Sequence, residues 1–195
     1  MKTNQIFLAI VVVAFTLASC GGSKKAPRKV YEAPPGTVSV ELPCTGTSYM
    51  SDKKHFRATG IQTSAMEAVA LKSAVAQSKS QIANDISVRV QNVLQNYNKI
   101  IGVESTNTTT QAFEDMTKQV ANTVLTGTRT ICQKFVRVTE EGPNKGKYKA
   151  YVTQEIDVDA VYNEVSSMVS KGDQAKVEYD YEKFKEVFEM EMQKN

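Results

Sequence analysis

The stretch of sequence that decides the fold runs from Ala65 to Tyr97 and reads AMEAVALKSAVAQSKSQIANDISVRVQNVLQNY. It contains no glycine or proline, and its larger apolar residues recur at steps of three, four or seven. Such spacing places them along one side of a helix. Alanines in its first third would allow that helix to lie close to a sheet. The sequence therefore predicts one long helix whose apolar side carries Val75, Ile82, Ile86, Val90, Val93 and Tyr97.

The residues just before this helix predict a strand and a helix cap. His55 to Ile61 alternates in character, which is typical of a strand with one buried face. That face would carry Phe56, Ala58 and Gly60. Thr63 or Ser64 is the expected N-cap, and Glu67, three residues after Ser64, would complete a capping box.

The segment after the long helix predicts a hinge and a second helix. Ser105 to Thr110 is polar and is expected to be the hinge. A shorter helix should follow and end at Gly127, because apolar residues again keep helical spacing. These residues are Phe113, Met116, Val120 and Val124.

A β-hairpin is expected next. Thr128 to Val138 is rich in β-branched residues, and Lys147 to Ile156 alternates between apolar and polar positions. Between them, Glu140 to Gly146 contains the turn cluster Gly-Pro-Asn-Lys-Gly. The two runs should therefore pair as antiparallel strands.

Two helices complete the predicted domain. The first would be capped by Asp157 or Asp159, carry Val161 and Val165 with Met168 or Val169, and end at Lys171-Gly172. The last would begin at about Gln174 and carry Val177, Tyr181, Phe184 and Phe188. The order β-α-α-β-β-α-α predicts an α+β fold, with a small antiparallel sheet of about three strands packed against the long helix. This domain would span residues 43–172, followed by an acidic C-terminal helix over residues 173–195.

That C-terminal helix has two possible roles. Val177, Tyr181, Phe184 and Phe188 follow a 4-3-4 step, which is the pattern of a helix that packs on a partner. They are the candidate partner-contact residues. The alternative, which the pattern favours, is that the helix docks on its own domain.

The amino terminus predicts export and lipid anchoring. Lys2 precedes an apolar run from Ile6 to Leu17, which is too short to span a bilayer comfortably, and together they form a signal-peptide pattern over residues 1–19. Leu17-Ala18-Ser19-Cys20 resembles the lipobox of bacterial lipoproteins, in which Cys20 would carry the lipid. An ordinary secretory signal is the alternative. Residues 20–42 would then form a flexible tether rich in proline and glycine. The absence of aspartate after Cys20 implies the outer membrane by the rule known for enteric lipoproteins.

With Cys20 lipidated, Cys44 and Cys132 remain as an even pair in a compartment that permits disulfides. We expect them to be bridged, closing a loop of 88 residues. The alternative is two free thiols.

Nothing in the sequence predicts catalysis, a metal or a cofactor. His55 is the only histidine, so the common two-histidine metal sites are excluded, and its pairing with Cys132 as a nucleophile is the weaker interpretation. Asp157 and Asp159 alone make a poor calcium site. Removing residues 1–19 leaves 23 basic and 21 acidic residues, which is too even a balance for a nucleic-acid-binding protein.

The chain also resembles a known group. Phe56-Arg-Ala-Thr-Gly60, the alanine-rich helix and a hairpin ending in Tyr151-Val152 are similar to small bacterial envelope lipoproteins typified by the twenty-kilodalton Helicobacter lipoprotein. A similar domain begins the flagellar assembly protein T. Pro43-Cys44 and Ser51 to Lys54 look like lipoproteins of the Bacteroides group. The resemblance implies an envelope protein and supplies no catalytic residues.

Two functions are expected from these observations. The first is a non-enzymatic, membrane-anchored module that binds envelope proteins or itself, facing the periplasm or the cell exterior. The second is a domain that binds a small ligand or the cell wall. An exposed row of apolar residues on the C-terminal helix would favour the first function. An exposed pocket ringed by Tyr49, Tyr97 or Tyr148 would favour the second.

Overall fold

The computed structural model describes residues 36–37, 40–102, 106–171 and 180–194 of the 195-residue chain. Contacts between residues divide the chain into two units, Met1–Ser39 and Val40–Asn195. The signal segment, Cys20 and most of the tether lie outside the described residues. The folded domain is therefore the second unit, and the C-terminal helix belongs to it.

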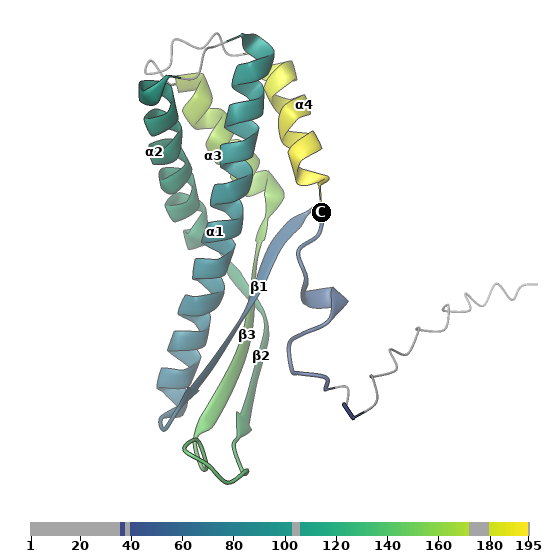
Figure 1. The fold of residues 1–195 in the computed structure, drawn as a ribbon, viewed down its shortest axis with the longest axis vertical. Helices are drawn as coiled ribbons and strands as arrows, with labels where there is room; N and C mark the ends of the chain where they lie inside the picture. Colours follow the sequence, from purple (N-terminus) through teal and green to yellow (C-terminus); the bar gives the residue numbers. More distant parts are fainter. Residues whose placement is uncertain (1–35, 38–39, 103–105, 172–179, 195) are drawn as a thin grey trace, which may run out of the picture. The chain divides into compact units, whose positions relative to one another are not determined.

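The domain contains a three-stranded antiparallel sheet in the order β1-β3-β2 (Figure 1). Its strands are β1 (His55–Ser64), β2 (Arg129–Arg137) and β3 (Tyr148–Asp157). The predicted hairpin is confirmed, because β2 pairs with β3. β3 also pairs with β1 along all ten residues, from His55 with Asp157 to Ser64 with Tyr148. As the central strand, β3 is buried on both faces from Ala150 to Ile156.

Within the described residues, four helices accompany the sheet, in the predicted order. They are α1 (Glu67–Ile101), α2 (Asn107–Val124), α3 (Val158–Lys171) and α4 (Tyr181–Met192). Two short 3₁₀ helices, η1 (Thr47–Tyr49) and η2 (Leu125–Gly127), precede β1 and follow α2. The α+β class and the β-α-α-β-β-α-α order are thus confirmed.

The predicted cap of α1 and the predicted hinge before α2 are wrong. The N-cap of α1 is Met66, which makes no side-chain cap, and not Thr63 or Ser64. Ser64 is still paired in β1, so it cannot also cap the helix, and its hydroxyl accepts a bond from the Met66 backbone N–H at 3.2 Å. The expected hinge is also mostly helix: α2 begins at Asn107, and Thr106 forms a reciprocal capping box with Thr109.

The long helix lies against β1 and β3. Gly60 faces it so closely that a Cβ there would be 1.9 Å from the carbonyl oxygen of Ala74. Beside this contact, Ala70 and Ala74 pack against Ala150 and Val152. Ala70 and Ala74 therefore have the role expected of the alanines near the start of α1, whereas Ala65, Ala68 and Ala76 are exposed. The larger core lies farther along α1, where α2, α3 and α4 pack together (Figure 1).

The opposite face of the sheet is crossed by residues 40–54, which we call the strap. A disulfide joins Cys44 in the strap to Cys132 in β2, with their Cα atoms 5.6 Å apart, so the predicted bridge is confirmed. The carbonyl oxygen of Cys44 also accepts bonds from the hydroxyls of Thr59 and Thr153, both at 3.0 Å. Tyr151 packs against the two cysteines. The strap, which follows the predicted tether, is thus bonded to the middle of the sheet.

Candidate functional site

The C-terminal helix docks on its own domain, which is the alternative that its pattern favoured. Phe184 and Phe188 are buried in the core. The ring of Phe184 meets Tyr97 edge-on at 5.3 Å between centroids, and that of Phe188 meets Tyr162 at 5.1 Å. The prediction that Phe184 contacts a partner is therefore wrong, because its surface is used inside the domain. Phe188 is only 3% exposed, and what it exposes lies at the groove described next.

The other two candidate partner-contact residues have different outcomes. Tyr181 remains 47% exposed at the first position of α4. Val177 lies outside the described residues. The helix itself begins later than expected, with Asp180 as its N-cap, whose carboxylate accepts a bond from the Lys183 backbone N–H at 3.1 Å. That bond, followed by one from the Lys183 side chain, lowers the pKa of Asp180.

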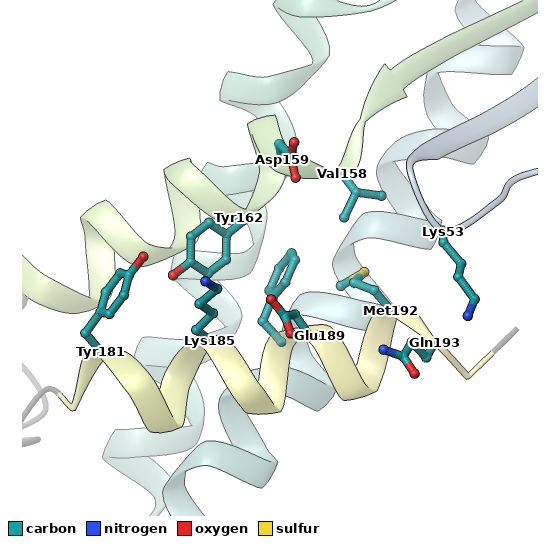
Figure 2. Close-up of a pocket in the computed structure, with 10 residues that line it drawn as sticks. Lys53, Val158, Asp159, Tyr162, Tyr181, Lys185, Glu189, Met192 and Gln193 are labelled. Atoms are coloured by element: carbon teal, nitrogen blue, oxygen red, sulfur yellow. The ribbon is translucent and has the colours of Figure 1, made fainter.

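Docking of α4 leaves a groove between it and α3 (Figure 2). Its volume is about 340 Å³. The groove runs from Tyr181 at the start of α4 to Gln193 just past its end, and Lys53 of the strap stands beside the Gln193 end. Its lining therefore comes from three separate parts of the chain.

The groove combines an apolar floor with charged margins. Val158, Phe188 and Met192 supply the apolar surface, and Tyr162 faces α4 from α3 (Figure 2). The margins hold two basic side chains, Lys53 and Lys185, and two acidic side chains, Asp159 and Glu189. None of these four makes an ion pair or a side-chain hydrogen bond with another described residue. An apolar floor with a few polar groups at its edges is the usual composition of a ligand site.

The strap side of the sheet carries an ion network. The Arg57 guanidinium donates to Glu155 at 2.5 Å and to Asp52 at 2.6 Å. Arg129 donates to the other Glu155 oxygen at 2.8 Å and to Asp157 at 3.2 Å. Each carboxylate therefore has a cationic partner, and the network joins the strap to β1, β2 and β3.

The pKa values in this network favour its ionised state. The backbone N–H of Lys54, and then the guanidinium of Arg57, hold the pKa of Asp52 far below its usual range. Burial alone would raise the pKa of Glu155, but hydrogen bonds from Arg57 and Arg129 outweigh it and lower that pKa. At neutral pH the ionised network therefore holds the strap against the sheet.

His55 belongs to this network. Its Nδ1 lies 3.2 Å from Asp52 and its Nε2 lies 3.2 Å from Asp157. Its suggested nucleophilic partner, Cys132, is bonded to Cys44 and carries no thiol. The His55–Cys132 pair is therefore excluded. Among the described residues, no group of three or more His, Cys, Asp or Glu is placed to hold a metal ion.

The tyrosines expected to ring a pocket do not do so. Tyr97 is buried, and its hydroxyl accepts a bond from the Asp180 backbone N–H at 2.7 Å. Tyr49 packs on the disulfide, and Tyr148 packs near Ala150. The tyrosines that do line a groove are Tyr162 and Tyr181, which sequence reasoning did not bring together because they lie on different helices.

A second hollow, of about 480 Å³, lies between α1, the end of α4 and the strap. Its polar groups are largely engaged within the domain: Arg89 donates to the backbone oxygen of Glu191 at 2.7 Å, and the Glu191 carboxylate accepts from Asn96 at 2.6 Å. Burial raises the pKa of Asp85 at its edge. The hydrogen bonds beside this hollow therefore hold α4 on α1.

In the part of the chain that the structure describes, none of the helices has the length and apolar character needed to cross a membrane. Comparisons of the chain with protein-family models, curated proteins and solved structures gave no significant match.

Proposed function

We propose that this chain is a non-enzymatic lipoprotein of the bacterial cell envelope that binds another envelope component. The observation that carries the proposal is the α3–α4 groove, whose four charged side chains have no partner among the described residues. Charged groups beside an apolar surface favour a complementary ligand that supplies both apolar contact and opposite charge. A peptide segment of a neighbouring envelope protein has both.

The anchoring half of the proposal rests on the lipobox-like sequence that ends at Cys20. The Cys44–Cys132 disulfide supports it, since such bonds persist in oxidising compartments outside the cytosol. Two or three acyl chains on Cys20 would hold the chain on the membrane almost permanently. The outer membrane is the proposed location, and the resemblance to small envelope lipoproteins is part of the same proposal.

Lipid attachment is tested in cells grown with labelled palmitate. The wild-type chain should carry the label and separate with the membrane fraction, whereas the Cys20→Ser variant should carry none. A Cys44→Ser/Cys132→Ser variant is the matched control, because it loses two cysteines but keeps Cys20, and it should be labelled like the wild type. An unlabelled wild-type chain would overturn the anchoring proposal.

Binding in the groove is tested by site-specific crosslinking in intact cells. A photoreactive residue replaces Tyr181, which is exposed at the groove, and in a control chain it replaces Ile100, which is 51% exposed at the end of α1. The proposal expects one discrete protein adduct from position 181 that is absent from position 100. It also expects the adduct to weaken when Lys185→Glu reverses the charge of the groove margin. Equal adducts from both positions, or no response to Lys185→Glu, would contradict binding in the groove.

A small-ligand site is the second candidate. The groove volume of about 340 Å³ lies within the range of small-molecule sites, and two tyrosines line it. In this case the position-181 chain would give no protein adduct. Instead, a low-mass compound would remain with the purified wild-type chain and be lost from the Tyr162→Ala variant.

A further inference from the structure

Charge in the folded domain is separated between its two ends. We define the distal end as residues 63–72 and 134–149, where β1 turns into α1 and where β2 and β3 are connected. These two segments contain six basic and three acidic residues. The remaining described residues from 40 to 194 contain twelve basic and fourteen acidic residues. A net charge of +3 at the distal end therefore contrasts with −2 elsewhere.

The basic side chains of the distal end are available to a surface. Lys72, Lys134, Arg137 and Lys145 are exposed, and Lys147 is partly exposed. Within the described residues, Lys72 and Lys134 have no ion-pair partner, and Lys145 pairs only with Glu141, which is also exposed. Pairs between exposed groups are weak, so an external anion can replace them.

Large apolar side chains are exposed at the same end. Met66 at the N-cap of α1 is 64% exposed, and Val69 in the first turn is 44% exposed. Val136 near the end of β2 is 39% exposed and pairs with Lys149. Figure 1 shows the start of α1 and the β2–β3 connection at the same end of the domain. The distal end thus combines exposed basic groups with exposed apolar side chains, whose contact with water is unfavourable.

This combination suits the surface of an anionic bilayer. Lysine and arginine are attracted to acidic headgroups, and nearby apolar side chains enter the boundary between headgroups and acyl chains. A soluble polyanion would use the basic groups but offer no apolar layer for Met66 and Val69. The bilayer therefore accounts for both features of this end.

The geometry of the chain permits this contact. The twenty residues from Cys20 to Val40 can span at most about 70 Å. The ten-residue β1 is only about 33 Å long, so such a tether reaches either end of the sheet. Because the tether is attached to the sheet through Cys44, the distal end can turn toward the membrane without unfolding.

We propose that the distal end docks on an anionic phospholipid bilayer, inserting Met66 and Val69 among the headgroups while its lysines contact acidic lipids. This inference rests on the proposed lipid anchor. Docking would hold the domain upright on the membrane, so that the helical end, with the α3–α4 groove, projects away from it. The groove would then bind its partner at a fixed distance from the bilayer.

The test uses the full lipidated chain in vesicles and a single tryptophan, because the natural sequence has none. Met66→Trp places the reporter at the distal end, and Ile100→Trp places it at the other end of the same helix. In vesicles that contain roughly one-third phosphatidylglycerol, brominated lipid should quench the Met66→Trp emission about twofold and shift it to the blue. The Ile100→Trp emission should not change. High salt should remove the response, because it screens the attraction.

Charge variants complete the test. Lys134→Gln, Lys145→Gln and Lys147→Gln together should abolish the Met66→Trp response. Lys99→Gln, Lys118→Gln and Lys171→Gln remove the same charge from exposed positions elsewhere and should leave the response intact. Quenching that is equal at positions 66 and 100, or absent in anionic vesicles, would overturn the docking. In that result the chain still floats with the vesicles, whereas failure of the proposed anchor leaves it unbound and without lipid mass at Cys20.

Discussion

Gly60 on β1 lies directly beneath the backbone of Ala74 on α1. A Cβ on Gly60 would sit 1.9 Å from the Ala74 carbonyl oxygen and 2.9 Å from the backbone nitrogen of Ser78. Both obstacles are helix backbone, which cannot turn aside as a flexible side chain can. The contact fixes how closely the helix and the sheet approach, and it explains why small residues line this part of α1.

Gly60→Ala should therefore destabilise the domain strongly. Separating α1 from the sheet would disturb the packing of Ala70 and Ala150, and we expect a loss of about 3 kcal/mol in the free energy of unfolding. Gly127→Ala is the control, because a Cβ there would meet only the Ile156 side chain at 3.8 Å. Urea denaturation of the two variants measures the difference. Similar midpoints for both would contradict the close approach.

The disulfide should contribute much of the stability of the oxidised domain. Cys44 and Cys132 close a loop of 88 residues, which restricts the unfolded chain, and the chain-entropy model gives about 4–5 kcal/mol. Urea denaturation with and without a reductant measures this contribution. Cys44→Ser/Cys132→Ser should match the reduced wild type and show no response to reductant. The prediction is wrong if oxidised and reduced wild type unfold at the same urea concentration.

The elements of the fold were predictable because each carries a local pattern. The apolar steps along α1 and the turn cluster between β2 and β3 depend only on neighbouring residues. Where an element begins was less predictable. Ser64 has the right chemistry for a cap, but its pairing with Tyr148 extends β1 beyond the predicted end at Ile61. Tertiary pairing therefore prevailed over a local capping preference.

The groove was not predictable for a similar reason. Tyr162 and Lys185 lie on separate helices and meet at one groove only because α4 docks along α3. The apolar step through Phe184 and Phe188 showed that α4 must cover something, but a sequence pattern does not say whose surface it covers. The disulfide was easier to predict, because Cys44 and Cys132 were the only pair left after Cys20.

Docking of α4 on its own domain predicts unequal effects along its apolar side. Phe184→Ala should lower the free energy of unfolding by about 4 kcal/mol, since it empties a fully buried site beside Tyr97. Tyr181→Ala, at an exposed position three residues earlier, should cost less than about 1 kcal/mol. Thermal unfolding followed by circular dichroism compares the two. If Phe184→Ala were as stable as Tyr181→Ala, α4 would not be part of the core.

The beginning of α4 offers a test of its cap. Asp180→Ala removes the acceptor of the Lys183 backbone N–H and should destabilise the first turn of α4. Asp180→Asn keeps a side-chain oxygen at the same place and should recover most of the loss. Hydrogen exchange of the first turn of α4 reports the effect locally, and faster exchange is expected only for Asp180→Ala. Equal exchange in the two variants would show that charge, and not the cap, holds this turn.

The lowered pKa of Glu155 predicts how the stability of the domain depends on pH. Its pKa in the folded domain lies below the unfolded value, so it binds fewer protons when folded, and its contribution is present above the ordinary pKa of about 4.3 and is lost as the pH falls further. At pH 7, Glu155→Gln should cost about 3 kcal/mol, because it removes the carboxylate that Arg57 and Arg129 share in a nearly buried site. Below about pH 4 the wild type loses this advantage, and the two unfolding curves should converge. Glu189→Gln is the control, since its exposed carboxylate has no partner among the described residues, and at pH 7 it should unfold at nearly the same urea concentration as the wild type. Urea denaturation across this pH range tests the linkage, and a constant gap between wild type and Glu155→Gln would refute it.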